Sequence, residues 1–162
     1  MKLIDEIIDL LSSEESNLAT ALLKTKILLY KLGENELLDW VNGELQGYSD
    51  ITDLPDYRIL PLTIRGNVSN GAYRYSNQSL PLLHLDEDVR VKLDTNYLTQ
   101  SIAVIEGYAE NESLKIQILP EFYSYISEAM GNDYQVESAW GEFSVGAMTQ
   151  VVTEVTGLPR FC

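Results

Sequence analysis

The sequence of 162 residues has one cysteine and one histidine, and each shortage excludes a class of protein. The cysteine is Cys162, the last residue, so neither an internal disulfide framework nor a cysteine-based zinc site can form. The single histidine, His84, excludes a histidine-rich metal site. No uncharged stretch approaches the roughly 20 apolar residues that span a membrane, and acids stand where a secretory signal would carry its apolar core. We therefore expect a soluble, cytoplasmic protein.

Basic residues are also scarce: 11 lysines and arginines stand against 25 aspartates and glutamates, which gives a net charge of −14. Binding to phosphate groups requires a basic face, so we expect neither nucleic acid nor an anionic membrane as a partner. Hydrophobic residues make up 45% of the chain and charged residues 22%, the balance of a folded globular protein. The length predicts one domain over residues 1–162, large enough to bury a core without disulfides.

The acidic charge is not spread evenly along the chain. Residues 57–85 contain no acid, and their arginines are interleaved with tyrosines, as at many binding surfaces. The candidate binding residues in this stretch are Arg58, Arg65, Arg74, Tyr57, Tyr73 and Tyr75. The alternative is that the arginines neutralise the two acidic flanks of the stretch within the folded monomer.

The first third of the chain has the apolar spacing of helices. Helices are predicted over residues 3–11, from a capping box at residues 12–15 to Leu32, and from Asn35 to about Gly47. Their short joints predict that they pack as antiparallel neighbours. The second helix carries a heptad-like seam, which either packs in the core or forms an oligomer interface: Leu18, Leu22, Thr25, Leu29 and Leu32.

The centre of the chain has the two-residue period of a strand. Apolar alternation predicts a strand over residues 57–68, with Pro61 at an edge or a bulge because proline cannot donate to the ladder. Asn70 and Gly71 tolerate positive φ, so they predict a type I′ turn and a partner strand over residues 72–75. We therefore expect a central β-hairpin.

The rest of the chain combines helices with short strands. We expect a helix from Asp86 to about Ala109, a strand over residues 114–118, a helix over residues 120–131, a strand over residues 134–140 (or else a helix), and a last helix over residues 144–155. The whole pattern predicts an α+β fold in which helices dominate: a three-helix N-terminal segment, a central β-hairpin, then further helices and short strands.

The sequence contains no recognisable constellation for catalysis or cofactor binding. His84 has Asp86 and Asp88 nearby, but no serine stands in a Gly-x-Ser-x-Gly elbow, and we interpret His84 as a half-buried imidazole at a strand-to-helix junction. Capping of a helix explains the acidic run at residues 86–88 more simply than a Mg²⁺ site. Phosphate-binding glycine motifs are missing. We therefore expect no enzymatic activity, no cofactor and no metal.

Several tracts together match a known pattern. They are residues 2–8, 17–24, 37–48, 54–58, 66–67 and 135–140, and the most specific run from Trp40 to Tyr48 and from Pro55 to Arg58. On these tracts the chain resembles the AbiTii domain family over essentially residues 2–155. The resemblance implies a bacterial protein linked to abortive infection, a defence against phage, and it carries over no catalytic residue.

The end of the sequence departs from this resemblance. Family members continue the last helix with basic and leucine-rich turns, whereas Gly157 and Pro159 stop it here. We expect a truncated, frameshifted or minimal form of the domain without those turns, in which a groove is left open. Short apolar helices need a partner surface, and identical copies most often supply it around a two-fold axis. We therefore predict a homodimer, with interface residues Ile4, Ile8, Leu11, Met148, Val151 and Val155.

Two functions compete at this point. The first is a non-enzymatic module of phage defence that binds protein partners or oligomerises. The alternative is an acidic inhibitor, similar to an antitoxin, that covers a basic toxin or mimics nucleic acid. Carboxylates gathered on one exposed face would favour the inhibitor, and a self-complementary apolar patch would favour the module.

Overall fold

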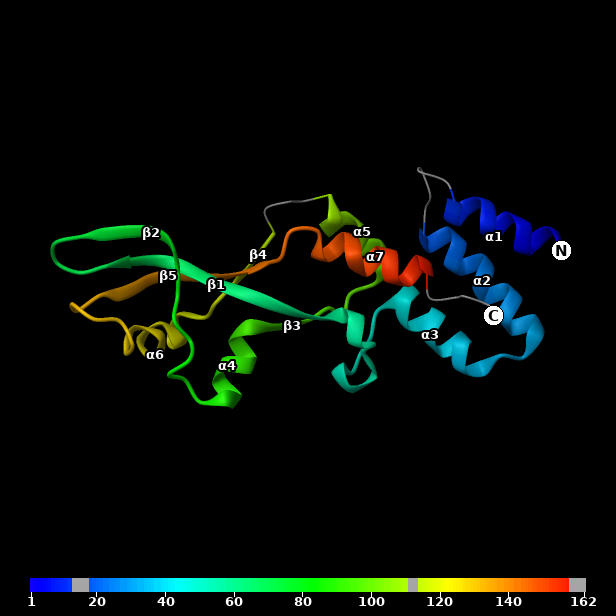
Figure 1. The fold of residues 1–162 in the computed structure, drawn as a ribbon. Coiled ribbons are helices and arrows are strands. Elements are labelled where there is room, and N and C mark those ends of the chain that lie inside the picture. Colours follow the sequence, from blue (N-terminus) through cyan, green and yellow to red (C-terminus); the bar gives the residue numbers. More distant parts are fainter. Residues whose placement is uncertain (13–17, 111–113, 158–162) are drawn as a thin grey trace. The chain divides into compact units, whose positions relative to one another are not determined.

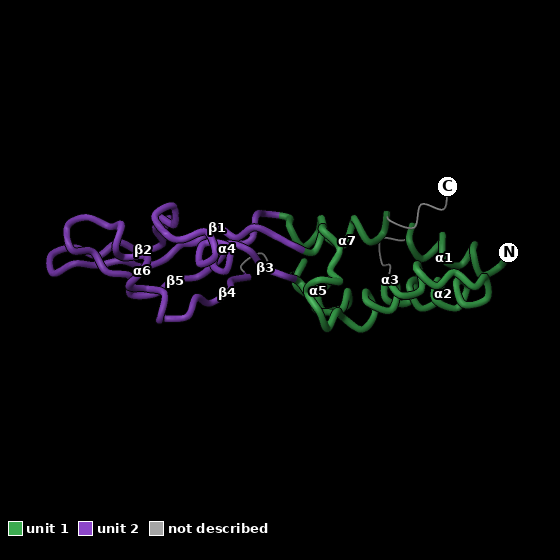
Figure 2. The backbone as a smooth tube through the Cα atoms, turned by 90° about the horizontal axis from the view of Figure 1, so that it is seen from below, with its two compact units in different colours: residues 1–58, 98–111, 146–162 green, residues 59–97, 112–145 purple. Residues whose placement is uncertain are grey.

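The computed structural model describes residues 1–12, 18–110 and 114–157, which divide between two compact units (Figures 1 and 2). Unit 1 comprises residues 1–58, 98–111 and 146–162, and unit 2 comprises residues 59–97 and 112–145. Unit 1 is helical and unit 2 carries an antiparallel sheet, so the predicted α+β class is confirmed. That these units form a single domain stays a prediction.

Unit 1 consists of helices joined by short connections. Its elements are α1 (Lys2–Ser12), α2 (Leu18–Leu32), α3 (Asn35–Gln46), the short 3-10 helices η1 (Ile51–Asp53) and η2 (Asp56–Arg58), α5 (Ile102–Ala109) and α7 (Ala147–Gly157). Helix α2 packs against α1, α3 and α5, and α7 packs against α5. The three predicted N-terminal helices are confirmed, whereas the predicted capping box extends outside the described residues. No helix within the described ranges is long and apolar enough to cross a bilayer.

The predicted seam of α2 packs in the core of unit 1. Leu18, Leu22, Thr25 and Leu29 are each no more than 3% exposed, whereas Leu32, at the end of the helix, is 63% exposed. The Thr25 hydroxyl donates to the carbonyl oxygen of Ala21 one turn earlier, at 2.8 Å, so this polar side chain is satisfied inside an apolar face. Core packing is therefore the correct reading for most of this seam.

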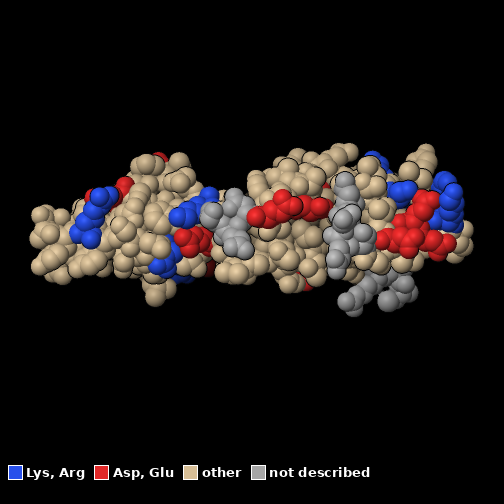
Figure 3. All heavy atoms as spheres, turned by 90° about the horizontal axis from the view of Figure 1, so that it is seen from above, with Lys and Arg blue, Asp and Glu red and all other residues tan. Residues whose placement is uncertain are grey.

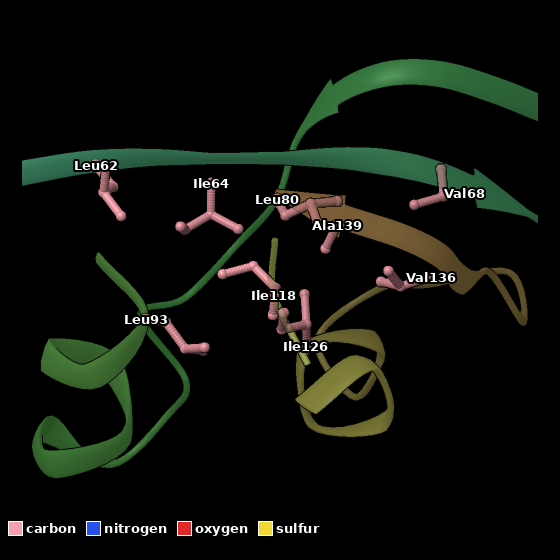
Figure 4. Close-up of a cluster of buried hydrophobic side chains, with 9 residues drawn as sticks. All are labelled: Leu62, Ile64, Val68, Leu80, Leu93, Ile118, Ile126, Val136 and Ala139. Atoms are coloured by element: carbon pink, nitrogen blue, oxygen red, sulfur yellow. The ribbon is translucent and has the colours of Figure 1, made fainter. Parts of the chain in front are cut away.

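Unit 2 is a sheet with helices on one face. Its elements are β1 (Ile59–Ser69), β2 (Arg74–Ser79), α4 (Glu87–Asp94), β3 (Thr95–Tyr97), β4 (Lys115–Gln117), the 3-10 helix η3 (Pro120–Phe122), α6 (Tyr123–Ser127) and β5 (Gln135–Phe143). The strand order is β2-β1-β5-β4, and β3 pairs with the start of β1. Figure 4 shows side chains of β1 directed towards Leu93 of α4 and Ile126 of α6, which form the core of this unit. The predicted strands near residues 114–118 and 134–140 are confirmed.

The predicted β-hairpin is confirmed, but its turn is not of type I′. Four residues, 70–73, connect Ser69 to its partner Arg74. The non-glycine residues with positive φ in the described chain lie elsewhere, at Asn77, Asn132 and Asp133. The loop is held instead by the Asn70 side chain, whose Oδ1 accepts from the amides of Ala72 and Tyr73 at 2.9 and 2.8 Å.

The single helix predicted from Asp86 to Ala109 is wrong. The chain forms α4, then the strand β3, then α5. Thr95, Asn96 and Tyr97 pair with Pro61, Leu60 and Ile59 of β1, a partner that is distant in sequence. At Pro61 the strand β1 has β3 as its neighbour and its pairing with β5 starts only at Leu62, which agrees with the predicted edge position of the proline.

Candidate functional site

A fully buried ion pair lies at the centre of unit 1. Glu44 follows the buried Val41 by one turn of α3 and therefore points into the core, and Arg58 stands at the end of η2; neither side chain is exposed to solvent. Two guanidinium nitrogens of Arg58 donate to the Glu44 carboxylate. Nε donates to Oε1 at 3.1 Å, and Nη2 donates to Oε2. Its Nη1 donates to the carbonyl oxygens of Leu98 and Gln100, each at 2.7 Å. One arginine thus joins α3, η2 and the segment before α5.

Two tyrosines and a tryptophan complete this network. The hydroxyls of Tyr48 and Tyr57 donate to Glu44 Oε1, that of Tyr48 at 3.0 Å, and Trp40 Nε1 donates to the Tyr57 hydroxyl at 2.9 Å. The Arg58 guanidinium also lies over the Tyr48 ring, 5.0 Å from its centroid. Burial, reinforced by the Glu44 carboxylate, raises the pKa of both tyrosines. Both therefore stay protonated and keep donating at neutral pH.

We interpret this network as one that positions side chains more than it stabilises the fold. A buried ion pair is often no more stabilising than packed apolar residues of the same volume, because both charges lose their hydration. Here every oxygen of the Glu44 carboxylate is satisfied, and the result is that the rings of Trp40 and Tyr48 are held in one arrangement. We interpret the ion pair as the support of the surface above it.

That surface is a groove with a volume of about 480 Å³. Its lining residues, all in unit 1, are Asp39, Trp40, Gly43, Gly47, Tyr48, Ser49, Asp53 and Pro55. Gly43 allows the Tyr48 ring to approach, because a Cβ there would lie 2.4 Å from Tyr48 Cε1. Gly47 has a φ of +88°, which lets the chain leave α3 and place the Tyr48 amide 2.8 Å from the carbonyl oxygen of Thr99.

The groove offers binding groups of three kinds. It has the aromatic rings of Trp40 and Tyr48, the hydroxyl of Ser49, and the carboxylates of Asp39 and Asp53. No lysine, arginine or histidine stands among the described residues that line it. Within the described part of the chain, no three histidine, cysteine, aspartate or glutamate side chains gather closely enough to hold a metal ion.

The six predicted binding residues fall into two separate groups. Arg58 and Tyr57 belong to the buried network of unit 1, so Arg58 is not a surface residue as the sequence pattern indicated. Arg65, Arg74 and the tyrosines at positions 73 and 75 lie on the β1–β2 hairpin of unit 2. The alternation of arginine and tyrosine along the chain therefore does not produce one continuous surface.

Arg58 and Arg74 support the alternative interpretation, in which the arginines neutralise acidic residues of the same monomer. Arg58 pairs with Glu44, and Arg74 Nε lies 2.9 Å from an oxygen of Glu137. Arg65 takes a different role: its Nε donates to the Asn77 side chain at 2.6 Å.

The hairpin tyrosines stack on each other, and Tyr75 also makes a tilted ring contact with a third tyrosine, Tyr134. The ring of Tyr75 lies 6.5 Å from that of Tyr73 and 5.8 Å from that of Tyr134, measured between centroids. Tyr75 and Tyr134 line a shallow depression of about 250 Å³ that also involves Val68 and Met130. Tyr73, Tyr75 and Arg74 are the exposed members of the predicted binding site in unit 2.

The predicted interface on α7 is already covered. Met148, Val151 and Val155 are at most 6% exposed, because α7 packs against α5 within unit 1. On α1, the side chains of Ile4 and Leu11 are half-buried, whereas Ile8 is 54% exposed. The expected missing turns and the groove they would leave concern residues outside the described ranges.

An exposed apolar stripe on α2 was missed by the sequence pattern. Leu23, Ile27 and Tyr30 recur at helical spacing and are 52%, 51% and 78% exposed. The composition of α2 could have drawn attention to this helix, because it contains three lysines and no acid in a chain with a net charge of −14.

His84 also differs from its predicted environment. It is exposed rather than half-buried, and its Nε2 lies 2.7 Å from the carbonyl oxygen of Tyr125. The hydrogen bond fixes the imidazole at the surface of unit 2.

The fold and the site define an α+β protein in which a buried ion pair supports a surface groove. A model of the AbiTii family matches residues 2–158, nearly the whole chain, so the chain belongs to the AbiTii family. The name of the family links it to abortive infection, a form of phage defence. A search among curated proteins returned no match, and neither did a search among solved structures. The tracts that carried the resemblance, Trp40 to Tyr48 and Pro55 to Arg58, are those that build the groove and its buried support.

Proposed function

We propose that this chain is a non-enzymatic module of phage defence, and that it assembles with a second copy of itself through α1 and α2. The observation that carries the proposal is the exposed stripe of Leu23, Ile27 and Tyr30. Large apolar side chains that are grouped on one helix and exposed by half or more are typical of an interaction surface.

The charges of the two helices favour a second copy as the partner. Helix α2 presents Lys26 and Lys31 beside its stripe, and α1 presents Asp5 and Asp9 beside the exposed Ile8. A two-fold axis would bring the acidic α1 of each copy against the basic α2 of the other, so one contact is made twice. Within one copy, Lys24 pairs with Glu6 at 2.7 Å, and among the described residues no other ion pair involves the charges of these two helices.

The distribution of acids favours the module over the acidic inhibitor. On the face shown in Figure 3, lysines or arginines lie beside several of the aspartates and glutamates of the described residues, within each unit. A protein that mimics nucleic acid would instead present a continuous row of carboxylates.

Light scattering at tens of micromolar protein tests the proposal. We expect a homodimer for the wild type and a monomer for Ile27→Glu, because the new carboxylate would be buried against an apolar surface. Leu83→Glu is the matched control: Leu83 is 88% exposed in unit 2, and its replacement should leave the dimer intact.

The same variants connect assembly with defence. In bacteria that express the protein with its neighbouring genes, Ile27→Glu should restore phage plating and Leu83→Glu should not. A wild-type monomer, or full defence by a monomeric Ile27→Glu variant, contradicts the proposal.

A further inference from the structure

The groove beside Trp40 has a negative lining without a counter-ion. Asp39 comes from α3 and Asp53 from η1, and both are exposed. Neither carboxylate takes part in an ion pair of the described residues. The cation nearest in the network, Arg58, is buried and already paired with Glu44, so its charge is compensated from within. A ligand with a positive charge therefore matches this lining, and an anionic one is repelled.

The aromatic residues of the lining indicate which kind of cation fits the groove best. The Trp40 indole is fixed by its hydrogen bond of 2.9 Å to the Tyr57 hydroxyl, so its ring is held in place before any ligand arrives. Tryptophan is the best aromatic partner of a cation, and a planar guanidinium can stack on it. The same network shows this geometry once, where the Arg58 guanidinium lies over the Tyr48 ring.

We infer that the groove binds an arginine side chain of a partner protein. The guanidinium stacks on Trp40 while its five N–H donors reach the carboxylates of Asp39 and Asp53 and the hydroxyl of Ser49. A lysine ammonium is a single compact charge and satisfies fewer of these groups. A volume of about 480 Å³ accommodates an arginine side chain together with the peptide backbone that carries it.

This inference goes beyond the proposed function and uses a different surface. The self-association through α1 and α2 leaves the groove free, so that each copy can engage one further protein. The occupant is defined by its chemistry: an exposed arginine on a loop or tail.

The fluorescence and the indole N–H resonance of Trp40 can report binding in the groove. The chain has two tryptophans, and Trp140→Phe leaves Trp40 as the sole tryptophan. Trp140 belongs to unit 2, where it donates to Glu142, so its replacement does not touch the groove. The probes are three capped peptides, Ac-Gly-Arg-Gly-NH₂, its lysine counterpart and its glutamine counterpart, titrated against Trp40 fluorescence and the indole N–H resonance.

We expect a saturable change with the arginine peptide and affinity about tenfold lower for the glutamine peptide, which lacks the charge. The lysine peptide should bind more weakly than the arginine peptide. The variant Asp39→Asn/Asp53→Asn should lose at least about tenfold in affinity for arginine. The control Asp88→Asn/Asp133→Asn removes the same charge from exposed positions of unit 2 and should bind like the wild type.

Three results would overturn the inference: equal binding of the glutamine peptide, lysine binding as strong as arginine binding, or arginine binding that survives Asp39→Asn/Asp53→Asn. Circular dichroism and light scattering on that variant test whether it is folded and whether it still self-associates, and we expect both. These measurements distinguish a loss of arginine binding in the groove from a loss of the proposed dimer.

Discussion

At the scale of the residue, the most informative side chain is Arg58. Two nitrogens of its guanidinium, Nε and Nη2, donate to the Glu44 carboxylate, and the third, Nη1, donates to two backbone carbonyl oxygens. A lysine has no guanidinium and could not make these contacts together. The pair therefore depends on arginine, and each partner is costly to remove alone, since the other charge would stay buried without compensation.

Arg58→Met should lower the free energy of unfolding by about 3–5 kcal/mol, because it leaves the Glu44 carboxylate buried and unpaired. Urea unfolding monitored by circular dichroism measures the change. The double variant Arg58→Met/Glu44→Gln should recover part of that loss, since no buried charge remains. Equal losses in the single and double variants would show that the ion pair is not what the fold depends on here.

The tyrosines of the network predict a loss of stability at high pH. Burial raises the pKa of Tyr48 and Tyr57 in the folded state above the ordinary value of about 10. Above pH 10 the unfolded chain therefore loses protons that the folded chain retains, and stability falls as pH rises. Each tyrosine contributes a slope of up to about 1.4 kcal/mol per pH unit.

Urea unfolding between pH 8 and pH 11 tests this dependence. Tyr57→Phe should show a shallower decline above pH 10 than the wild type. Tyr125→Phe removes an exposed hydroxyl from unit 2 and is the control. Identical slopes for wild type and Tyr57→Phe would rule out Tyr57 as the cause.

At the scale of the element, long-range pairing overrides local periodicity. The apolar spacing of residues 86–109 suits a helix, yet Thr95–Tyr97 forms β3 because it supplies hydrogen-bonding partners to the first residues of β1. Helix α3 shows the complementary case: its interior contains Gly43, a poor helix former, because the Tyr48 ring occupies the place of a side chain.

Two of the helix glycines of unit 1, Gly43 and Gly107, should respond in opposite ways to alanine. Gly107→Ala in α5 should stabilise by about 0.5–1 kcal/mol, since no atom lies within 4 Å of the position that a Cβ would take and alanine favours a helix. Gly43→Ala gains the same propensity but displaces the Tyr48 ring, so it should destabilise by about 1–3 kcal/mol. Thermal unfolding of both variants decides the matter. A stabilised Gly43→Ala would mean that the ring moves aside without cost.

At the scale of the whole molecule, we expect the net charge to limit the range of partners. A net charge of −14 is expected to repel phosphate polymers, and the arginines of residues 57–85 do not form a continuous basic face because Arg58 is buried and Arg74 is paired. We therefore expect partner proteins with basic or apolar surfaces, which would match a groove that contains two carboxylates and a stripe of apolar side chains.

The chain should therefore not bind duplex DNA, duplex RNA or anionic vesicles at physiological salt. Gel shift and vesicle sedimentation are the measurements. A gel shift that weakens steeply with salt, and that disappears in Arg65→Glu/Arg74→Glu, would show that the hairpin binds phosphate after all.

Much of this protein is determined by its sequence alone. Apolar spacing within one helix or one strand is a local property, and it is enough to predict α1, α2, α3, the β-hairpin and the α+β class. Composition likewise does not depend on the fold, and the net charge of the chain predicts which partners are repelled. The tract from Trp40 to Tyr48 carries the family resemblance through the identity of its residues, and the family match over residues 2–158 confirms it.

Only the tertiary structure decided where the site lies. Arg58 and Arg65 look alike in the sequence, yet the first is buried against a carboxylate 14 residues away and the second lies in a hairpin of the other unit. Likewise, Val151 on α7 and Ile27 on α2 are both apolar helix residues, and packing covers the first and leaves the second exposed. Periodicity specifies which face of an element is apolar, but burial depends on what the rest of the chain places against that face.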